Sequence, residues 1–463
     1  MPKAVPAGAA EADARTSSVP RAALAVSAAC ALLAVAATLP PALELPLWQD
    51  EVASARVLLE PSPSGVVAHV ARTESTPPGW YLLAWTGRRA GLSVESLRLL
   101  SVALAAALSG LAVLYARRFL PLWTAGLAGV LTALAWQTVA HGQELRAYAL
   151  LTLLTLALAV LVERAAEAPT GGRLALLALC AALGAYTHYF FVLSAAAGAL
   201  WVLSEPALRA SAARVAGAVA LGTAALLAWL PGLAEQVGAE RFGWIDVFDP
   251  LKLAYVHSAL FWNPGPLFAE DGSSPEPGEA LGRLAILGLV AYGSTVLWRI
   301  DARARLCALM ALAPVALAGL AWLAGLRIIT GRNLIGVLLF AAVALAAVLL
   351  PLPRRAVPLG VAAAVSLAAV GYLRSPVDER VPFDEVASAL VAEGWAPGDP
   401  LLVFGSFTDF RSPLEWYLPG EVVLEEAVPE RRCEEVYVVT DIPDGRSFVE
   451  GAPVRSRAET GPV

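Results

Sequence analysis

Long, uninterrupted hydrophobic segments recur along this chain, and they limit its fold more than any other feature. Most are roughly 18–22 residues long, the length at which an α-helix crosses the hydrocarbon core of a bilayer. Hydrophobic residues make up 58% of the 463 residues and charged residues 16%, whereas a soluble domain is about half apolar and a quarter charged. Strands of a membrane β-barrel would alternate polar and apolar residues, and these segments do not. The sequence therefore predicts an all-α polytopic membrane protein.

About eleven segments are predicted to span the membrane. They are residues 22–40, 97–115, 121–140, 145–162, 173–187, 189–204, 214–231, 281–298, 306–325, 333–350 and 356–373. The pair 173–187 and 189–204 is short and is interrupted by His188. This pair predicts either two thin helices or one long kinked element.

The distribution of arginine predicts the orientation. If the N-terminus lies in the cytoplasm, every link on the cytoplasmic side is basic, as the positive-inside rule requires. The basic residues of these links are Arg117, Arg118, Arg164, Arg173, Arg209, Arg214, Arg299, Arg303, Arg305, Arg354 and Arg355. Abundant Ala and Arg beside only two Lys indicate a GC-rich bacterial genome. We therefore expect a multi-pass protein of the bacterial plasma (inner) membrane.

The predicted organisation has three parts. Residues 1–21 form a cytoplasmic N-terminal segment, 22–373 a transmembrane domain, and 374–463 a small extracytoplasmic C-terminal domain. Two long outer loops, 44–95 and 232–282, interrupt the transmembrane domain.

Both the first outer loop and the tail show patterns of local structure. Apolar stretches too short to span, such as Gly79–Trp85, predict short helices along the outer membrane surface. In the tail, Phe383–Glu393 has helical periodicity, and Pro400–Phe404 and Glu435–Thr440 have the pattern of short strands. The tail is therefore predicted to be a compact α/β region.

Composition excludes several classes of function. The net charge is −6 and no basic face is evident, so nucleic-acid binding is not expected. Cys30, Cys180 and Cys307 fall inside predicted spans and Cys433 is alone in the tail, which argues against a disulfide framework. No His, Cys and Asp residues have metal-ligand spacing.

Two adjacent carboxylates, Asp50 and Glu51, directly follow the first predicted span. One interpretation is a pair of solvated acids near a helix start, where acids are common. The other is a general base that deprotonates an acceptor hydroxyl or amine.

Further polar motifs flank later spans in a definite order. They are Pro77-Pro78-Gly79-Trp80-Tyr81, Leu97-Arg98-Leu99, Gln143-Glu144-Leu145-Arg146-Ala147-Tyr148, Thr187-His188-Tyr189 and an Arg-rich stretch from Arg327 to Asn333. With Asp50-Glu51, this ordered set resembles the GT-C superfamily of membrane glycosyltransferases over roughly residues 22–350. The branch it resembles contains the protein O-mannosyltransferases and the aminoarabinose lipid A transferases. Thr76 stands where that branch often has His, and Asn333 stands where it often has Tyr, so the sugar and the acceptor remain open.

The resemblance implies a sugar donor linked to a polyprenyl monophosphate. Transfer would occur outside the membrane, in one displacement that inverts the anomeric carbon. The acceptor would be a protein, a glycolipid or a polysaccharide. No cofactor is implied; Asp50 and Glu51 offer ligands for a divalent metal, although the branch works without one. Asp50 is the expected base, and the neighbouring Glu51 would orient the acceptor or the base.

The leaving lipid phosphate needs cations at the outer surface. Arg327 and Arg332 lie there in the predicted topology, and guanidinium groups bind phosphate in a bidentate manner. Lys252, in the second outer loop, is a weaker candidate. The alternative, non-catalytic interpretation is that these arginines contact lipid headgroups.

Other candidate residues are predicted to line or support the same cavity. They are Tyr81, Glu144, Arg146, Tyr148 and His188. Glu144 and Arg146 also fit a purely structural salt bridge, and a lone His also fits a packing role.

Three rival interpretations stay open. A transporter or lipid flippase would also have many spans, although its ionisable residues usually lie at mid-membrane and its halves are paired. A scaffold whose tail binds a partner would leave Asp50-Glu51, Arg327 and Arg332 unexplained. A glycan polymerase or ligase would also use lipid-linked sugars.

Overall fold

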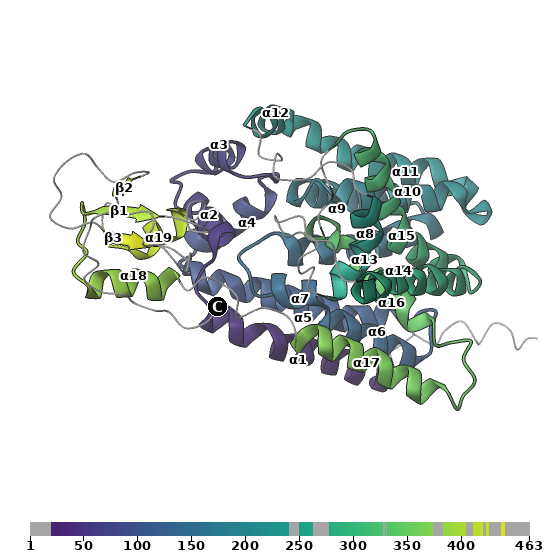
Figure 1. The fold of residues 1–463 in the computed structure, drawn as a ribbon. Helices are drawn as coiled ribbons and strands as arrows, with labels where there is room; N and C mark the ends of the chain where they lie inside the picture. Colours follow the sequence, from purple (N-terminus) through teal and green to yellow (C-terminus); the bar gives the residue numbers. More distant parts are fainter. Residues whose placement is uncertain are drawn as a thin grey trace, which may run out of the picture.

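The computed structural model describes residues 20–239, 250–262, 277–326, 329, 331–373, 383–403, 411–419, 423–425 and 437–439. These residues form a bundle of long helices, with short helices and a small sheet gathered at one end (Figure 1).

Most helices of the bundle coincide with predicted spans, but the predicted span 121–140 forms two helices, and one further helix, Pro250–Phe261, comes from the predicted outer loop 232–282. Within the described residues, six are long and apolar enough to cross a membrane, and five shorter apolar helices accompany them. The bundle elements are α1 (Arg21–Glu44), α5 (Val94–Ala116), α6 (Leu122–Leu134), α7 (Trp136–His141), α8 (Tyr148–Glu167), α9 (Gly171–Thr187), α10 (Phe191–Ser204), α11 (Arg209–Ala224), α13 (Pro250–Phe261), α14 (Pro277–Trp298), α15 (Ala302–Leu323), η4 (Arg332–Val337), α16 (Leu338–Ala347) and α17 (Val357–Leu373). The chain is thus an all-α multi-pass membrane protein in this part, as predicted.

The interrupted pair forms two helices. α9 ends at Thr187 and α10 begins at Phe191, so His188 lies in the short link between them. Of the two alternatives that the sequence left open, the structure has two separate helices.

Ion pairs join the helix ends that the arginine pattern assigns to the cytoplasm. Arg118, after α5, pairs with the buried Glu163 near the end of α8. Arg305, in the first turn of α15, donates two hydrogen bonds to Glu205 at the end of α10. These helix ends therefore meet at a common end of the bundle, as alternating orientation requires.

The first outer loop forms three short helices. They are α2 (Gln49–Val57), α3 (Pro63–Thr73) and α4 (Gly79–Arg89). Ser62 caps α3, because its hydroxyl accepts the N–H of Gly65 at 3.1 Å, and Pro63 occupies the first helical position. The predicted span 214–231 ends in η2 (Ala225–Trp229), and α12 (Leu230–Gly238) leads from it into the second outer loop. Gln236 of α12 donates to the carbonyls of Val70 and Thr76, which joins the two outer loops.

The tail contains the predicted α/β region. Its elements are α18 (Phe383–Ala392), β1 (Pro400–Val403), α19 (Arg411–Tyr417), β2 (Val423–Glu425) and β3 (Tyr437–Val439). The strands form a parallel sheet in the order β2-β1-β3, with Pro400 opposite Val423 and Leu401 opposite Tyr437. Figure 1 shows this sheet, α18 and α19 at the end of the bundle that carries α2 and α4. The tail therefore lies at the same end as the first outer loop.

Candidate functional site

Asp50 lies where the first long helix gives way to the first outer loop. It is the second residue of α2, and its side chain is 22% exposed. Nη1 of Arg332 donates to its Oδ2 at 2.9 Å, and Nη2 of Arg146 lies 3.6 Å from the same oxygen. Residues from α2, from the link between α7 and α8, and from η4 thus meet at a single carboxylate oxygen.

Two opposing effects act on the pKa of Asp50. Burial, the larger single effect, would raise the pKa, whereas the charges of Arg146 and Arg332 lower it. Together with the influence of His141, the positive groups prevail, and the pKa is lowered. Asp50 is therefore ionised at neutral pH.

Arg146 also contacts the rest of the first outer loop. Its Nη1 donates to the carbonyl oxygen of Asp50 at 3.1 Å, to the hydroxyl of Ser54 at 3.0 Å and to Oε2 of Glu74 at 3.2 Å. The Tyr81 hydroxyl donates to Glu74 at 2.6 Å, and burial raises the pKa of Tyr81 well above its usual value. The predicted support residues Arg146 and Tyr81 therefore lie together beside Asp50.

Glu51 differs sharply from its neighbour, because its side chain is 0% exposed. Arg98 donates to both of its carboxylate oxygens, at 2.7 and 2.6 Å, and the N–H of Leu145 donates to one of them at 2.8 Å. Arg98 also donates to the carbonyls of Leu45 and Pro46 after α1. The burial of Glu51 favours a structural role for this residue over direct contact with an acceptor.

Arg98 stands in the Leu97-Arg98-Leu99 motif, but no role was predicted for it. A signal was present: Arg98 lies in the second turn of α5, a predicted span, and a charged side chain there requires a partner. The partner could not be identified from sequence, since 47 positions separate the two residues.

Gly79 gives a physical reason for the Pro-Pro-Gly motif. A Cβ atom at this position would lie 2.5 Å from the carbonyl oxygen of Tyr186, near the end of α9. Only glycine permits this approach between α4 and α9 without displacement of the backbone. The close contact fixes α4, and therefore Tyr81, relative to the bundle.

A row of aromatic and imidazole rings lines the neighbouring part of the site. His141 shares a hydrogen bond of 2.7 Å between its Nδ1 and Glu144, and its ring centroid lies 4.3 Å from that of Tyr148. Tyr148 lies 5.7 Å from the ring of His188, which accepts the N–H of Phe190. Among the described residues, the buried Nε2 atoms of His141 and His188 have no hydrogen-bond partner.

His188 is neutral in this setting. Burial, and then the charges of Arg146 and Arg332, lower its pKa to about 3. An uncharged imidazole with an unpaired nitrogen is suited to a hydrogen bond with a ligand, whereas it cannot neutralise a phosphate.

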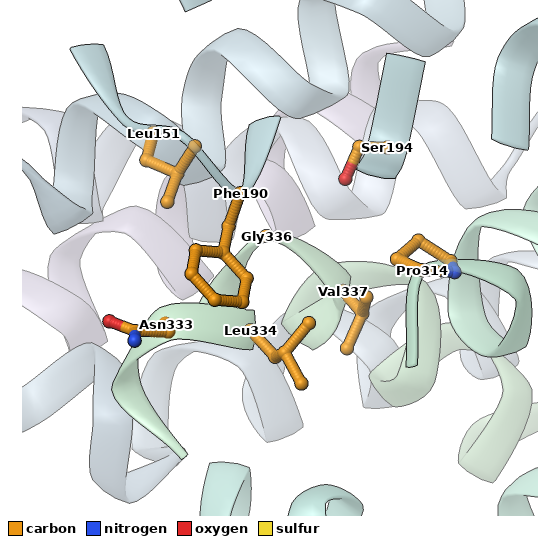
Figure 2. A pocket seen from close by; sticks show the side chains of 8 residues that line it. All are labelled: Leu151, Phe190, Ser194, Pro314, Asn333, Leu334, Gly336 and Val337. Atoms are coloured by element: carbon orange, nitrogen blue, oxygen red, sulfur yellow. The ribbon is translucent and has the colours of Figure 1, made fainter. Parts of the chain in front are cut away.

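A narrow, mostly apolar crevice lies beside Asn333, and it is packed too closely to hold a water molecule (Figure 2). Its lining residues are Leu151, Phe190, Ser194, Pro314, Asn333, Leu334, Gly336 and Val337. Figure 2 shows the ring of Phe190 pointing toward Leu334 of η4. Asn333 and Leu334 follow Arg332 in the chain, so this crevice is lined partly by η4, the element that carries Arg332.

The roles of the two other predicted phosphate ligands stay predictions. Arg327 lies outside the described residues. Lys252 lies half-buried near the start of α13, and its phosphate role stays a prediction. Within the described part of the chain, no group of three or more His, Cys, Asp and Glu residues gathers in a way that would hold a metal ion.

Comparison with known proteins gives matches at the level of structure. No protein-family model matches the chain, and no curated protein matches it by sequence. The crystal structure of ArnT from Cupriavidus metallidurans bound to undecaprenyl phosphate aligns with a TM-score of 0.54 at 13% identity, over 87% of this chain and 86% of that one. The apo-state structure of the same protein gives a TM-score of 0.53 at 13% identity, over 86% and 85%. These alignments confirm the fold that the ordered motifs indicated.

Proposed function

Because the chain has the fold of the GT-C membrane glycosyltransferases, we propose that it transfers a sugar from a polyprenyl-phosphate donor to an acceptor at the outer membrane surface. One observation carries this proposal: a partly exposed carboxylate, Asp50, lies between the guanidinium groups of Arg332 and Arg146, at the end of the bundle that carries the short helices α2 and α4. The transfer requires a base for the acceptor and positive charge for the leaving phosphate, and these three side chains supply both.

The cations are assigned to the donor. As the bond between the anomeric carbon and the phosphate oxygen breaks, the lipid phosphate gains negative charge. Arg332 is suited to meet this charge, since guanidinium binds phosphate oxygens in a bidentate manner. The first isoprene units are assigned to the apolar side chains of Figure 2, which are carried partly by the same element as Arg332 and must move apart to admit them.

Asp50 is assigned the role of general base. It takes the proton from the acceptor hydroxyl or amine while the acceptor attacks the anomeric carbon and the polyprenyl phosphate leaves from the opposite face. The single displacement inverts the anomeric configuration. Asp50 is preferred to Glu51 because its side chain is partly exposed, whereas Glu51 is enclosed by Arg98 and Leu145.

The bonds to Asp50 have a consequence for the order of events. While Arg332 and Arg146 face its Oδ2, the carboxylate is a weak base. A bound donor phosphate competes for the same guanidinium groups, which raises the basicity of Asp50 once the donor is in place. In this proposal, the donor binds before the acceptor is deprotonated.

The substrates are defined only by class. The donor carries its sugar on a polyprenyl monophosphate, and the acceptor is a protein, a glycolipid or a polysaccharide. The proposed setting is the bacterial inner membrane, with the N-terminus in the cytoplasm and residues 374–463 outside. Under the alternative function, a transporter or flippase would move a lipid-linked or anionic substrate and leave it chemically unchanged.

The test uses the purified full-length protein in vesicles with a panel of polyprenyl-phosphate sugars and acceptors. Transfer releases free polyprenyl phosphate and produces a glycosylated acceptor, whereas transport leaves the donor intact. We expect Asp50→Asn to lower turnover at least about 100-fold while donor binding is kept.

Glu167→Gln is the matched control, because this acid forms an exposed ion pair with Arg303 at the opposite end of the bundle. It should retain wild-type turnover. Near-normal turnover of Asp50→Asn would move the base elsewhere, and an intact donor with every sugar tested would reject the transferase proposal.

A further inference from the structure

The C-terminal region holds the helix that carries Asp50. Directly before α2, the backbone N–H of Leu47 donates to the hydroxyl oxygen of Tyr417 at 2.5 Å. In the last turn of α2, Nη2 of Arg56 donates to Oε2 of Glu415 at 2.6 Å. α19 is therefore bonded to the segment directly before α2 and to the last turn of α2, and Figure 1 shows it beside α2.

Tyr417 also joins two hydrophobic clusters. Its ring packs against the cluster of the first outer loop, which includes Val52 and Trp80, and against the cluster of the tail, which includes Leu401 and Leu414. A side chain packed against both parts transmits displacement from one to the other. Tyr417 therefore connects the tail to the first outer loop both through its hydrogen bond to Leu47 and through apolar packing.

α2 depends on such contacts for its position. It has 9 residues, and helices this short are not stable without tertiary contacts. The pair Arg98–Glu51 holds one side of it against the bundle, and α19 holds the segment directly before it and its last turn. A catalytic group displaced by about 1 Å can lose roughly 100-fold in rate.

We propose that Tyr417 and Glu415 are positioning residues, through which the C-terminal region sets the place of α2 and thus of Asp50. The effect on turnover rests on the function proposed above, whereas the mechanical contact does not. The tail is then part of the transfer unit, and a ligand or partner that moves α19 regulates turnover through α2.

The mechanical part is tested by hydrogen exchange of the purified full-length protein. In the double variant Tyr417→Phe/Glu415→Gln, backbone amides of residues 47–57 should exchange about tenfold faster, because one hydrogen bond and one partly exposed ion pair are lost. The single variants are measured beside it, so that a double variant that fails to fold still leaves a result. Tyr292→Phe and Glu385→Gln, at exposed positions on α14 and α18, should leave this exchange unchanged.

The catalytic part is tested with a polyprenyl-phosphate sugar that the wild-type protein uses. The double variant should lose about tenfold in kcat and keep the KM for the donor within about twofold, because Arg332 is held on η4 instead. The acidic limb of its kcat–pH profile should also move, since Asp50 leaves its position between the guanidinium groups. The variants Arg56→Glu and Glu415→Arg each place two like charges opposite one another, whereas the double variant restores an ion pair. The double variant should therefore have a higher turnover than either single variant.

The outcomes separate the two proposals. Unchanged exchange of residues 47–57 overturns the inference whatever the activity. Faster exchange with unchanged kcat overturns the positioning role. If the wild-type protein transfers no sugar, the proposed function fails, and faster exchange still supports the contact between α19 and α2.

Discussion

The guanidinium group of Arg332 donates a hydrogen bond of 2.9 Å to the carboxylate of Asp50, although 282 positions separate the two residues. One residue lies in the first outer loop, and the other is the first residue of η4, directly before α16. Their contact makes a single site from two sequence motifs.

Replacement of Arg332 should affect the donor more than the fold. The side chain of its hydrogen-bonded partner Asp50 is 22% exposed, so loss of the Arg332 charge leaves this carboxylate partly solvated. We expect Arg332→Ala to raise the KM for the polyprenyl-phosphate donor roughly tenfold or more, as loss of a charge-assisted hydrogen bond implies. Arg332→Lys should recover only part of this, because an ammonium group lacks the bidentate geometry. Donor titrations of kcat and KM measure both variants, with Arg303→Ala as the control, and an unchanged KM for Arg332→Ala would exclude its phosphate role.

Replacement of Glu51 should affect the fold more than the chemistry. Glu51→Gln leaves Arg98, which is 2% exposed, with a buried charge and no carboxylate. Removing one partner of such a pair costs roughly 3–5 kcal/mol. Thermal unfolding of the detergent-solubilised protein should show a clear fall in Tm, whereas Asp50→Asn should show little. Equal Tm values for the two variants would mean that Glu51 is not the structural acid of the pair.

The pH dependence of transfer should reveal the cations beside Asp50. Because the folded pKa of this carboxyl lies below its ordinary value of 3.8, the base stays ionised down to that range. The profile of kcat/KM should therefore have its acidic limb below about pH 4. The ionised Asp50 also stabilises the folded protein, because its pKa is lower in the folded state than in the unfolded state. This contribution to the free energy of unfolding is fully present above the unfolded pKa and is lost as pH falls through the folded pKa.

Two comparisons check this assignment. Arg332→Ala should move the acidic limb of kcat/KM to higher pH, since one of the charges that lower the pKa is gone. In the wild-type protein, the acidic limb of kcat should lie above that of kcat/KM, because the bound donor phosphate shares the guanidinium groups. If the acidic limb lies at the same pH for wild-type kcat/KM, wild-type kcat and Arg332→Ala kcat/KM, it reports the titration of a group other than Asp50.

The predicted orientation is open to a labelling test. Ser64 lies exposed in α3 of the first outer loop, and Arg354 is exposed in the link before α17. In a background without the native cysteines, Ser64→Cys should react with a membrane-impermeant maleimide added to intact cells. Arg354→Cys should react only after permeabilisation. The reverse pattern would place Asp50 on the cytoplasmic side and reject transfer at the outer surface.

The sequence alone determined the membrane fold and the candidates for the site. Long apolar runs specify spanning helices, since a helix must satisfy its backbone groups internally in lipid. Asp50 and Arg332 were candidates because charges at span ends on the outer side require an explanation. The alternating patterns near residues 400 and 437 predicted two strands of the tail, whereas their parallel pairing came from the structure.

Only the tertiary structure distinguished Asp50 from Glu51. Consecutive residues on a helix point about 100° apart, so one of two adjacent acids faces the site and the other faces the bundle. Which one does so depends on the rotation of α2, and that rotation is set by Arg98, Tyr417 and Glu415. These partners lie between 47 and 370 positions away along the chain. Local patterns fix each helix, but its rotation depends on side chains that meet only after the whole chain has packed.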